Sequence, residues 1–322
     1  MSLAAVTAEP FDSEAVLSRT LFADITRLRV AEPDLVMELS ARRQRAAPLG
    51  PDGKLCILAA DHVARGVTSS GPDPLAMLDR RDLLARLVHV LRCGAADGVL
   101  ATVDVLEELL LLDHLVQERG DASFLGGRRL IASLNRGGLA GAAWELNDPP
   151  TGASPRTCAR LSLDGAKLLL RVALEDRDSL ETLRHADALI TAMNEYRLPV
   201  FVEPLPVRRV ADGGFELVRE AEPLARLVGV ASALGDSSRY LWLKLPWCED
   251  FQMVAGATTL PIVLLGGPSA GEPRQLLEQV RDGLAAGENV RGTMVGRGVL
   301  FPGERDPASV AAAIHGLVHE ER

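Results

Sequence analysis

Two of the three lysines in the chain, Lys167 and Lys244, lie inside apolar runs that read as strands. The remaining basic residues are Lys54 and thirty-two arginines, so the sequence uses arginine almost everywhere for surface charge. Arginine stays protonated and cannot act as an amine nucleophile, whereas a desolvated lysine can lose its proton and attack a carbonyl carbon. The placement of the two lysines therefore indicates Schiff-base chemistry.

Two carboxylates, Asp61 and Glu203, stand at the ends of other apolar runs. Side chains alternate along a strand, so Glu203 shares a face with Phe201, and Lys244 shares one with Trp242. If these faces point inward, the carboxylates and both lysines converge, and the carboxylates could move protons through the carbinolamine, imine and enamine steps. A second lysine would lower the pKa of the nucleophile, whereas the carboxylates would raise it, and the sequence leaves that balance open.

Further polar residues accompany these four, and several have a structural alternative. Arg171 lies on the same strand face as Lys167 and could contact the substrate or join an ion pair at the rim of the site. Lys167 could itself pair with a buried carboxylate, and Asp61 could cap the turn that begins at His62. Asn135 follows another apolar run and is a further candidate for substrate binding.

Eight short apolar runs alternate with longer amphipathic segments in the part of the chain that carries these residues. The runs are 55–61, 98–102, 130–135, 166–172, 198–203, 240–245, 261–266 and 292–296. This alternation is typical of an α/β fold, and eight strands over about 270 residues indicate a (β/α)8 TIM barrel. A doubly wound parallel sheet is the alternative, but it rarely needs eight strands in so regular a series.

Helices are expected between the runs, at 79–93, 104–119, 178–196, 221–235 and 273–286. Two connections, 136–165 and 205–220, are long for this fold. Both follow the carboxyl ends of strands, and barrel active sites are built at that end. We therefore expect the polar residues and these loops to share one face of the barrel.

The first fifty residues differ from the rest of the chain. They hold two helical patterns, at about 13–29 and 33–45, which precede a break rich in proline and glycine. We predict an N-terminal helical extension over residues 1–50 and a single barrel over residues 51–322.

Two glycine-bearing segments follow the last two strands. Gly266 and Gly267 come after the seventh run, and Gly296 precedes Arg297 after the eighth. Barrels frequently bind phosphate with these two loops, because glycine lets backbone N–H groups approach an anion. Arg297 could add a charge-assisted contact. The sequence therefore predicts a phosphate-binding site.

Charge and composition exclude several kinds of partner. The net charge of −9 and the pI near 5.3 argue against a nucleic-acid or anionic-membrane surface. No apolar stretch approaches the ~20 residues of a membrane span, and the first ten residues do not read as a signal peptide. The four cysteines form no CxxC pair, as expected of reduced thiols. We expect a cytoplasmic protein whose partner is a small molecule.

Metal and cofactor chemistry finds little support in the sequence. Of the six histidines, only His62 lies near the end of a strand. A zinc-dependent aldolase needs about three such ligands. No P-loop is present, and no Gly-x-Gly-x-x-Gly motif follows the first run. We expect no metal and no cofactor.

The order of motifs resembles the class I aldolases of bacteria and archaea, which include fructose-bisphosphate, tagatose-bisphosphate and deoxyribose-phosphate types. The matching features are Asp after strand one, Lys on strand four, Glu-Pro-Leu on strand five, Lys on strand six, Gly-Gly after strand seven and Gly-Arg after strand eight. The stretches at 59–66, 135–141 and 242–246 look closest to an actinobacterial family described as deoxyribose-phosphate aldolase-like and associated with myo-inositol breakdown. The resemblance covers residues 52–302.

This resemblance implies that Lys244 is the Schiff-base lysine. Its supporting lysine and carboxylates match Lys167, Glu203 and Asp61. The phosphate loops of the group match Gly266, Gly267, Gly296 and Arg297.

The chain also departs from the group. Glu203 occupies the region where the archaeal fructose-bisphosphate enzymes place a tyrosine, and Arg171 stands where the tagatose type tends to carry an aromatic residue. Together with Arg136, Arg208 and Arg209 in the long loops, Arg171 suggests an extra anionic group on the substrate. A carboxylate-bearing sugar phosphate would fit, and 2-deoxy-5-keto-gluconate 6-phosphate is the leading substrate guess.

We therefore expect a metal-independent class I aldolase acting on a phosphorylated keto sugar or sugar acid, with dihydroxyacetone phosphate as the ketone half and Glu203 as the general base. One alternative is an aldolase-type condensing enzyme of a biosynthetic pathway. Another is a phosphosugar-binding barrel without Schiff-base chemistry, acting as an isomerase or a regulator. A homo-oligomer is expected, with the N-terminal helices packed on a neighbour or plugging the lower end of the barrel.

Overall fold

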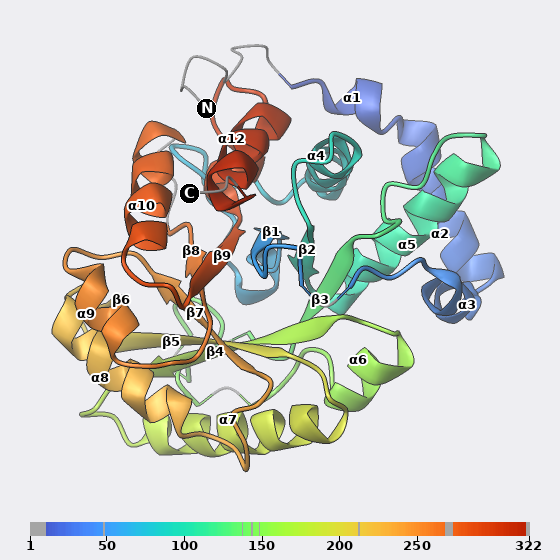
Figure 1. Cartoon of the computed structure of the whole chain (residues 1–322). Coiled ribbons are helices and arrows are strands. Elements are labelled where there is room, and N and C mark those ends of the chain that lie inside the picture. The colour runs from blue at the N-terminus through green and yellow to red at the C-terminus, as the bar shows by residue number, and fades with distance from the viewer. Residues whose placement is uncertain are drawn as a thin grey trace.

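Eight parallel strands close into a barrel in the computed structural model, which describes residues 11–47, 49–136, 138–142, 144–147, 149–211, 213–267 and 273–319 (Figure 1). The strands are β1 (Leu55–Ala59), β2 (Gly98–Ala101), β3 (Arg129–Ser133), β4 (Gly165–Val172), β5 (Val200–Arg209), β7 (Leu241–Pro246), β8 (Ile262–Leu265) and β9 (Val290–Val295). Pairing of β4 with β5 and of β1 with β9 completes the ring. The predicted (β/α)8 barrel is confirmed.

Helices between the strands cover the outside of the barrel (Figure 1). The longer ones are α4 (Arg80–Arg92), α5 (Val103–Glu118), α7 (Asp178–Glu195), α8 (Ala221–Ser232), α10 (Pro273–Ala285) and α12 (Pro307–His319). Shorter turns are η2 (Val63–Arg65), α6 (Pro155–Arg160), α9 (Phe251–Gly256) and α11 (Arg297–Leu300). Within the described ranges, no helix combines the length and the apolar character needed to cross a membrane.

Alternation of side chains along the strands builds two apolar layers. Ile57, Phe201 and Met294 belong to a cluster inside the barrel, and Trp242 packs against it. The intervening positions, such as Val202, face the helices and join the larger core outside. Because both faces of each strand are buried, the strands read as nearly continuous apolar runs. Polar residues that follow on the inward-facing positions therefore lie at the carboxyl ends of the strands, above this interior layer.

The N-terminal helices add an outer layer on one side of the barrel. Helix α1 (Ser13–Val16) contacts α4, and both α2 (Arg19–Ala31) and α3 (Leu35–Arg42) contact α5. Leu21 and Ile25 of α2 are buried and join the core between barrel and helices. Residues 1–10 of the predicted extension lie outside the described residues.

The segment after α3 runs under the lower end of the barrel. Arg43 Nη2 lies 2.7 Å from Asp164 Oδ2, and Arg45 Nε lies 3.0 Å from Asp164 Oδ1, just before β4 begins. Leu49 then lines a cavity of about 270 Å³ together with Trp242 and other residues at the base. The N-terminal helices thus pack on the side of the barrel, and the segment that follows them lines its lower end.

One predicted connection contains a hairpin. The segment at 205–220 was expected to be a loop, but β5 continues to Arg209 and pairs antiparallel with β6 (Phe215–Leu217). Arg208 forms an ion pair with Glu216 across this hairpin, and Arg209 forms one with Asp176. The pair of Arg208 with Glu216 joins the two strands and stabilises the hairpin, and both arginines have carboxylate partners of their own.

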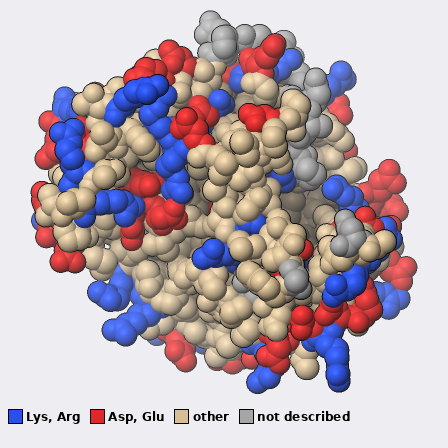
Figure 2. All heavy atoms as spheres, turned by 180° about the vertical axis from the view of Figure 1, so that it is seen from behind, with Lys and Arg blue, Asp and Glu red and all other residues tan. Residues whose placement is uncertain are grey.

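Charges of both signs are mixed over the face of the molecule turned away from the viewer in Figure 1. Figure 2 shows basic and acidic side chains interspersed around the rim of this face, with mainly other residues at its centre. A nucleic-acid surface would gather basic side chains on one face.

Candidate active site

Four charged side chains meet inside the barrel at the carboxyl ends of the strands. Lys244 Nζ donates to Glu203 Oε2 at 2.7 Å, and Lys167 Nζ lies 3.1 Å from the same oxygen. Lys167 Nζ also donates to Asp61 Oδ2 at 3.0 Å. All four residues are at most 8% exposed. Glu203 therefore bridges the two lysines, and Lys167 bridges the two carboxylates.

Strand register brings these side chains to one level. In the pairing of β4 with β5, Lys167 lies beside Phe201, and Glu203 lies two residues further along its strand. Phe201 in turn lies beside Trp242 of β7, which places Lys244 next to Glu203. The convergence follows from side-chain alternation, as the sequence pattern predicts.

Burial and charge act in opposite directions on the pKa values of this cluster. Burial alone would raise the pKa of Glu203, but Lys167 and Lys244 outweigh it and lower that pKa to about 2. Burial would also raise the pKa of Asp61, and Lys167 brings it below its ordinary value. At Lys167, burial lowers the pKa, but Asp61 and Glu203 raise it above its ordinary value. The carboxylates therefore prevail over burial at Lys167, which stays protonated at neutral pH.

Asn135, a predicted substrate contact, holds the β4 backbone. Its Oδ1 accepts a hydrogen bond from the Leu169 N–H, and its Nδ2 donates one to the Leu169 carbonyl, each at 2.8 Å. Ser133 of β3 donates to the Asn135 carbonyl at 2.9 Å, and its Oγ lies 3.3 Å from Asp61 Oδ2. The Asn135 side chain therefore holds the backbone of β4, the strand that carries Lys167, through two hydrogen bonds.

Replacing Asn135 with alanine is expected to lower the free energy of unfolding by about 2–4 kcal/mol, because it leaves a buried N–H and a buried carbonyl without partners. Urea denaturation measures the change. Asn147 is exposed and makes no such pair of hydrogen bonds to the described residues, so Asn147→Ala serves as the control, with an expected change within about 0.5 kcal/mol. Equal unfolding midpoints for the two variants would show that the hydrogen bonds of Asn135 to Leu169 contribute nothing to stability.

A cationic region lies beside the four charged residues, where β9 ends. Neither Arg297 nor Arg65 forms an ion pair with any described carboxylate, and the Nε atom of each is buried without a hydrogen-bond partner in the described part of the chain. Burial and the charge of Arg65 both lower the pKa of Arg297. Burial also lowers the pKa of the neighbouring His62 to about 4, so its imidazole is neutral at neutral pH. This region can accept an anionic group of a substrate.

Two of the predicted phosphate-loop glycines have conformations or surroundings that other residues would not fit. Gly267 has a φ of 63°. A Cβ at Gly296 would lie 2.4 Å from the Ala59 carbonyl oxygen and 2.5 Å from His62 Cε1. Gly266 precedes Gly267 after β8, while the Pro-Ser that continues this loop lies outside the described residues. The backbone therefore runs very close to the end of β1 at Gly296.

The other predicted substrate-binding arginines have protein partners. Arg171 is buried and forms an ion pair with Glu145, which comes from the long loop after β3. Arg136 donates from Nε to Thr151 Oγ1 at 2.9 Å within the same loop. Arg171 thus anchors this loop over the barrel mouth, as in the ion-pair alternative considered for it.

Sequence reasoning missed Arg65, Ser133 and Glu145 as members of this region. Arg65 stands four residues after Asp61, in the stretch that also contains His62, and its spacing from a strand-end carboxylate was the available signal. Ser133 lies two residues before Asn135 and so points the same way along β3. Glu145 comes from an irregular loop, where no periodicity reveals the direction of a side chain.

The cluster has the parts needed for amine chemistry on a carbonyl compound. A buried amine at Lys244 has a carboxylate acceptor for its proton at 2.7 Å, and that carboxylate shares its oxygen with a second ammonium group. A nucleophile and a base within hydrogen-bond reach are the usual requirement for covalent catalysis. Arg65 and Arg297 supply positive charge beside it, where a substrate anion would be attracted.

A family model described as Cgl0159-like matches residues 53–315 of the chain. The crystal structure of Cgl0159 from Corynebacterium glutamicum is 34% identical in sequence, covers 94% of this chain and 98% of its own, and superposes with a TM-score of 0.87.

More distant similarity extends to a synthase and to an aldolase. The 2-amino-3,7-dideoxy-D-threo-hept-6-ulosonate synthase 1 of Archaeoglobus fulgidus is 22% identical over 286 residues, which are 86% of this chain and 91% of that protein. The structure of a Schiff-base-forming fructose-1,6-bisphosphate aldolase is 22% identical, covers 88% of this chain and 100% of its own, and gives a TM-score of 0.59. At this level of identity, the second likeness shows a shared barrel fold.

Proposed function

The chain belongs to the Cgl0159-like family, and from that premise we propose that it is a metal-independent class I aldolase acting through a Schiff base at Lys244. The observation that carries the proposal is the buried contact of 2.7 Å between Lys244 Nζ and Glu203 Oε2 at the barrel mouth. The names of the more distant relatives, a Schiff-base-forming aldolase and a heptulosonate synthase, support the same reaction class.

The first steps follow from the contacts of Lys244. Its ammonium group gives a proton to Glu203, and the free amine attacks the carbonyl carbon of the substrate. The carbinolamine then loses water and becomes an iminium ion. Lys167 stays protonated, so its positive charge is shared by Glu203 and Asp61 before the transfer and is balanced by Asp61 once Glu203 carries the proton.

Cleavage uses the same carboxylate a second time. Once Glu203 has returned its first proton to the departing water, it accepts the proton of the substrate hydroxyl beside the scissile bond. The C–C bond breaks, the aldehyde leaves, and the electron pair forms an enamine on Lys244. Protonation of the enamine and hydrolysis of the iminium release the ketone, and condensation is the same path in reverse.

The substrate class is proposed from Arg65 and Arg297, which have no carboxylate partner among the described residues. Arg65 and Arg297 fit one phosphate, with Gly266, Gly267 and Gly296 in the adjoining loops, and dihydroxyacetone phosphate is the proposed ketone half. The ion pairs of Arg171, Arg208 and Arg209 weaken the reason for expecting a carboxylate on the substrate. Support for 2-deoxy-5-keto-gluconate 6-phosphate and a role in inositol breakdown therefore rests on the family resemblance.

Borohydride reduction of the untreated protein with dihydroxyacetone phosphate tests the reaction class. The expected product is one reduced adduct per chain, located at Lys244 by peptide mapping. An adduct on Lys167 would keep the reaction and exchange the roles of the lysines. If dihydroxyacetone phosphate, pyruvate and a panel of phosphoketoses all leave the mass unchanged, the phosphosugar-binding alternative replaces the aldolase.

The condensing-enzyme alternative draws support from the Archaeoglobus relative, whose name describes a synthase. Incubation with dihydroxyacetone phosphate and separate aldehydes, against cleavage of fructose 1,6-bisphosphate and 2-deoxy-5-keto-gluconate 6-phosphate, distinguishes the two. Condensation without cleavage of any phosphorylated sugar would favour the synthase.

Replacing Arg297 with methionine is expected to raise the KM for the phosphorylated ketone about 10- to 100-fold, because a charged hydrogen-bond donor to phosphate is lost. The preference for dihydroxyacetone phosphate over dihydroxyacetone should fall by the same factor. Arg274 is exposed on α10 and pairs with Glu278, so Arg274→Met is the control and should leave both values unchanged. An unaltered preference in Arg297→Met would place the phosphate elsewhere.

We include a cytoplasmic location and a homo-oligomer in the proposal. All four cysteines are free, and Cys56, Cys158 and Cys248 are buried, as suits a reducing compartment. Light scattering of the purified protein measures the assembly state.

A further inference from the structure

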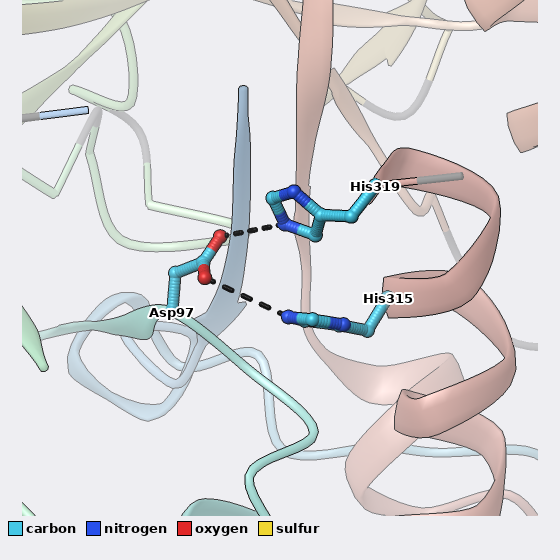
Figure 3. A group of neighbouring side chains, drawn as sticks. All are labelled: Asp97, His315 and His319. Atoms are coloured by element: carbon cyan, nitrogen blue, oxygen red, sulfur yellow. Dashed lines mark hydrogen bonds and ion pairs between the residues drawn. The ribbon is translucent and has the colours of Figure 1, made fainter. Parts of the chain in front are cut away.

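Two histidines and an aspartate gather at the end of the barrel opposite the proposed active site. His315 and His319 lie one turn apart on α12, and Asp97 comes directly before β2. Figure 3 shows both imidazole rings turned toward the Asp97 carboxylate, one ring facing each oxygen. Their side chains are 15–31% exposed, so the group is sheltered and still open to solvent.

The spacing of the three side chains suits a metal ion. His319 Nε2 lies 3.0 Å from Asp97 Oδ2, and His315 Nε2 lies 3.6 Å from Asp97 Oδ1. One ligand atom from each residue can be chosen so that all three lie within 4.8 Å of one another. Ligands bound tetrahedrally to Zn²⁺ at about 2.0–2.1 Å are separated by about 3.3 Å. Small side-chain shifts would bring the three to that geometry.

Neighbouring groups already orient two of the ligands. Asp52 Oδ2 lies 2.9 Å from His319 Nδ1, which leaves Nε2 directed at Asp97. The Cys56 N–H donates to Asp97 Oδ2 at 2.7 Å. A carboxylate on the far nitrogen of a ligating histidine is the usual outer partner in zinc sites, because it fixes the tautomer and raises the basicity of the ring.

Lys54 and Arg128 place positive charge near the two carboxylates of the group. Lys54 donates from Nζ to the Val318 carbonyl at 2.6 Å, so its charge lies beside the group. Arg128 donates from Nη1 to the carbonyl of Ala96, which precedes Asp97, at 2.9 Å, so a second positive charge accompanies the negative charges of Asp52 and Asp97. A bound cation would replace the proton that His319 shares with Asp97.

We propose that Asp97, His315 and His319 bind one divalent cation of the Zn²⁺ type, with water as the fourth ligand. Two imidazoles and one carboxylate favour Zn²⁺ over Mg²⁺, which prefers oxygen ligands. The cation would fasten the last described turn of α12 to the segments that precede β1 and β2. This site stands apart from Lys244 and serves the fold, so it is independent of the proposed aldolase reaction.

Titration of Zn²⁺ into the untagged, EDTA-treated full-length protein tests the proposal. We expect one equivalent to bind, with a rise in Tm, and Mg²⁺ to bind far more weakly. His315→Gln and His319→Gln should each weaken Zn²⁺ binding by about 100-fold or more, since loss of a mere outer partner already costs 10- to 100-fold. Binding of Co²⁺ should give the visible absorption of a tetrahedral site.

The control variant removes a histidine that pairs with a carboxylate elsewhere on the surface and does not belong to the proposed site. His114 lies 3.4 Å from Glu118 on α5, and His114→Gln should leave Zn²⁺ affinity unchanged. No binding of Zn²⁺ by the parent protein, or equal affinity in His315→Gln and the parent, would overturn the proposal and leave an ion pair at this place. Borohydride trapping at Lys244 should be the same with and without Zn²⁺. The outcome of the Zn²⁺ titration can therefore be distinguished from the outcome of the aldolase test.

Discussion

Replacement of Lys244 with arginine is expected to lower kcat for C–C bond cleavage by about 10,000-fold or more and to abolish the borohydride adduct. Arginine keeps the positive charge beside Glu203, so the buried ion pair can persist while the nucleophilic amine is lost. The expected outcome is therefore a folded, inactive protein. Steady-state kinetics and intact mass after reduction measure the two effects.

Lys54→Arg is the matched control for this variant. Lys54 lies at the lower end of the barrel, where its ammonium group binds the Val318 carbonyl, so activity and adduct should be those of the parent protein. An adduct that survives in Lys244→Arg would assign the nucleophile to another lysine. Retained cleavage with no adduct in either protein would contradict Schiff-base chemistry as a whole.

Replacement of Glu203 with glutamine is expected to lower kcat by about 100- to 10,000-fold, the range typical of a lost general base. Glutamine matches the shape of the side chain but cannot accept the proton of the substrate hydroxyl. Trapping at Lys244 should still occur, at a lower rate, because the amine remains. Single-turnover kinetics separate the two steps, with slow cleavage following a measurable adduct.

The same substitution removes a charge that two lysines share. Loss of one partner from a buried ion pair costs about 3–5 kcal/mol, so the free energy of unfolding should fall as well. Glu216→Gln, in the exposed hairpin pair with Arg208, should change neither stability nor kcat appreciably. If Glu203→Gln cleaves substrate as fast as the parent protein, another group is the base, and Asp61 is the next one to test.

The barrel and the meeting of its four charged residues could be predicted because both depend on local pattern. Alternation along the strands determines which side of β4, β5 and β7 each residue faces. Because the barrel is closed, the inward-facing residues of these strands meet in one site. Lysine and glutamate inside apolar runs are conspicuous because burial of a charge demands a partner.

Features that depend on irregular or distant segments could not be predicted in the same way. The partner of Arg171 is Glu145, from a loop without periodicity, and the sequence left the role of that arginine open. The hairpin of β5 and β6 was missed because Glu-Pro-Leu-Pro reads as the end of a strand, yet β5 accommodates both prolines. The cluster of Asp97 with two α12 histidines joins residues more than two hundred positions apart.

The ion pairs of the arginines reduce the number of arginines that can bind an anionic substrate. Thirty-two arginines in a chain of this length make any single one weak evidence for an anion site. Among the described residues, distances separate arginines that already have a carboxylate, such as Arg171, from Arg65 and Arg297 beside the reaction centre, which have none there. Only the second kind has charge left to offer a substrate.

The three N-terminal helices restrict how copies of this protein can assemble. By packing on α4 and α5, they occupy a side of the barrel that a bare barrel would leave free for a neighbouring subunit. Any self-association must then use another side or the outer surface of the helices themselves. Large apolar side chains are exposed elsewhere, among them Leu174, which is 95% exposed, and Leu180 on α7, which is 61% exposed. The extension thus blocks contact through α4 and α5, while these apolar side chains at and before α7 stay exposed.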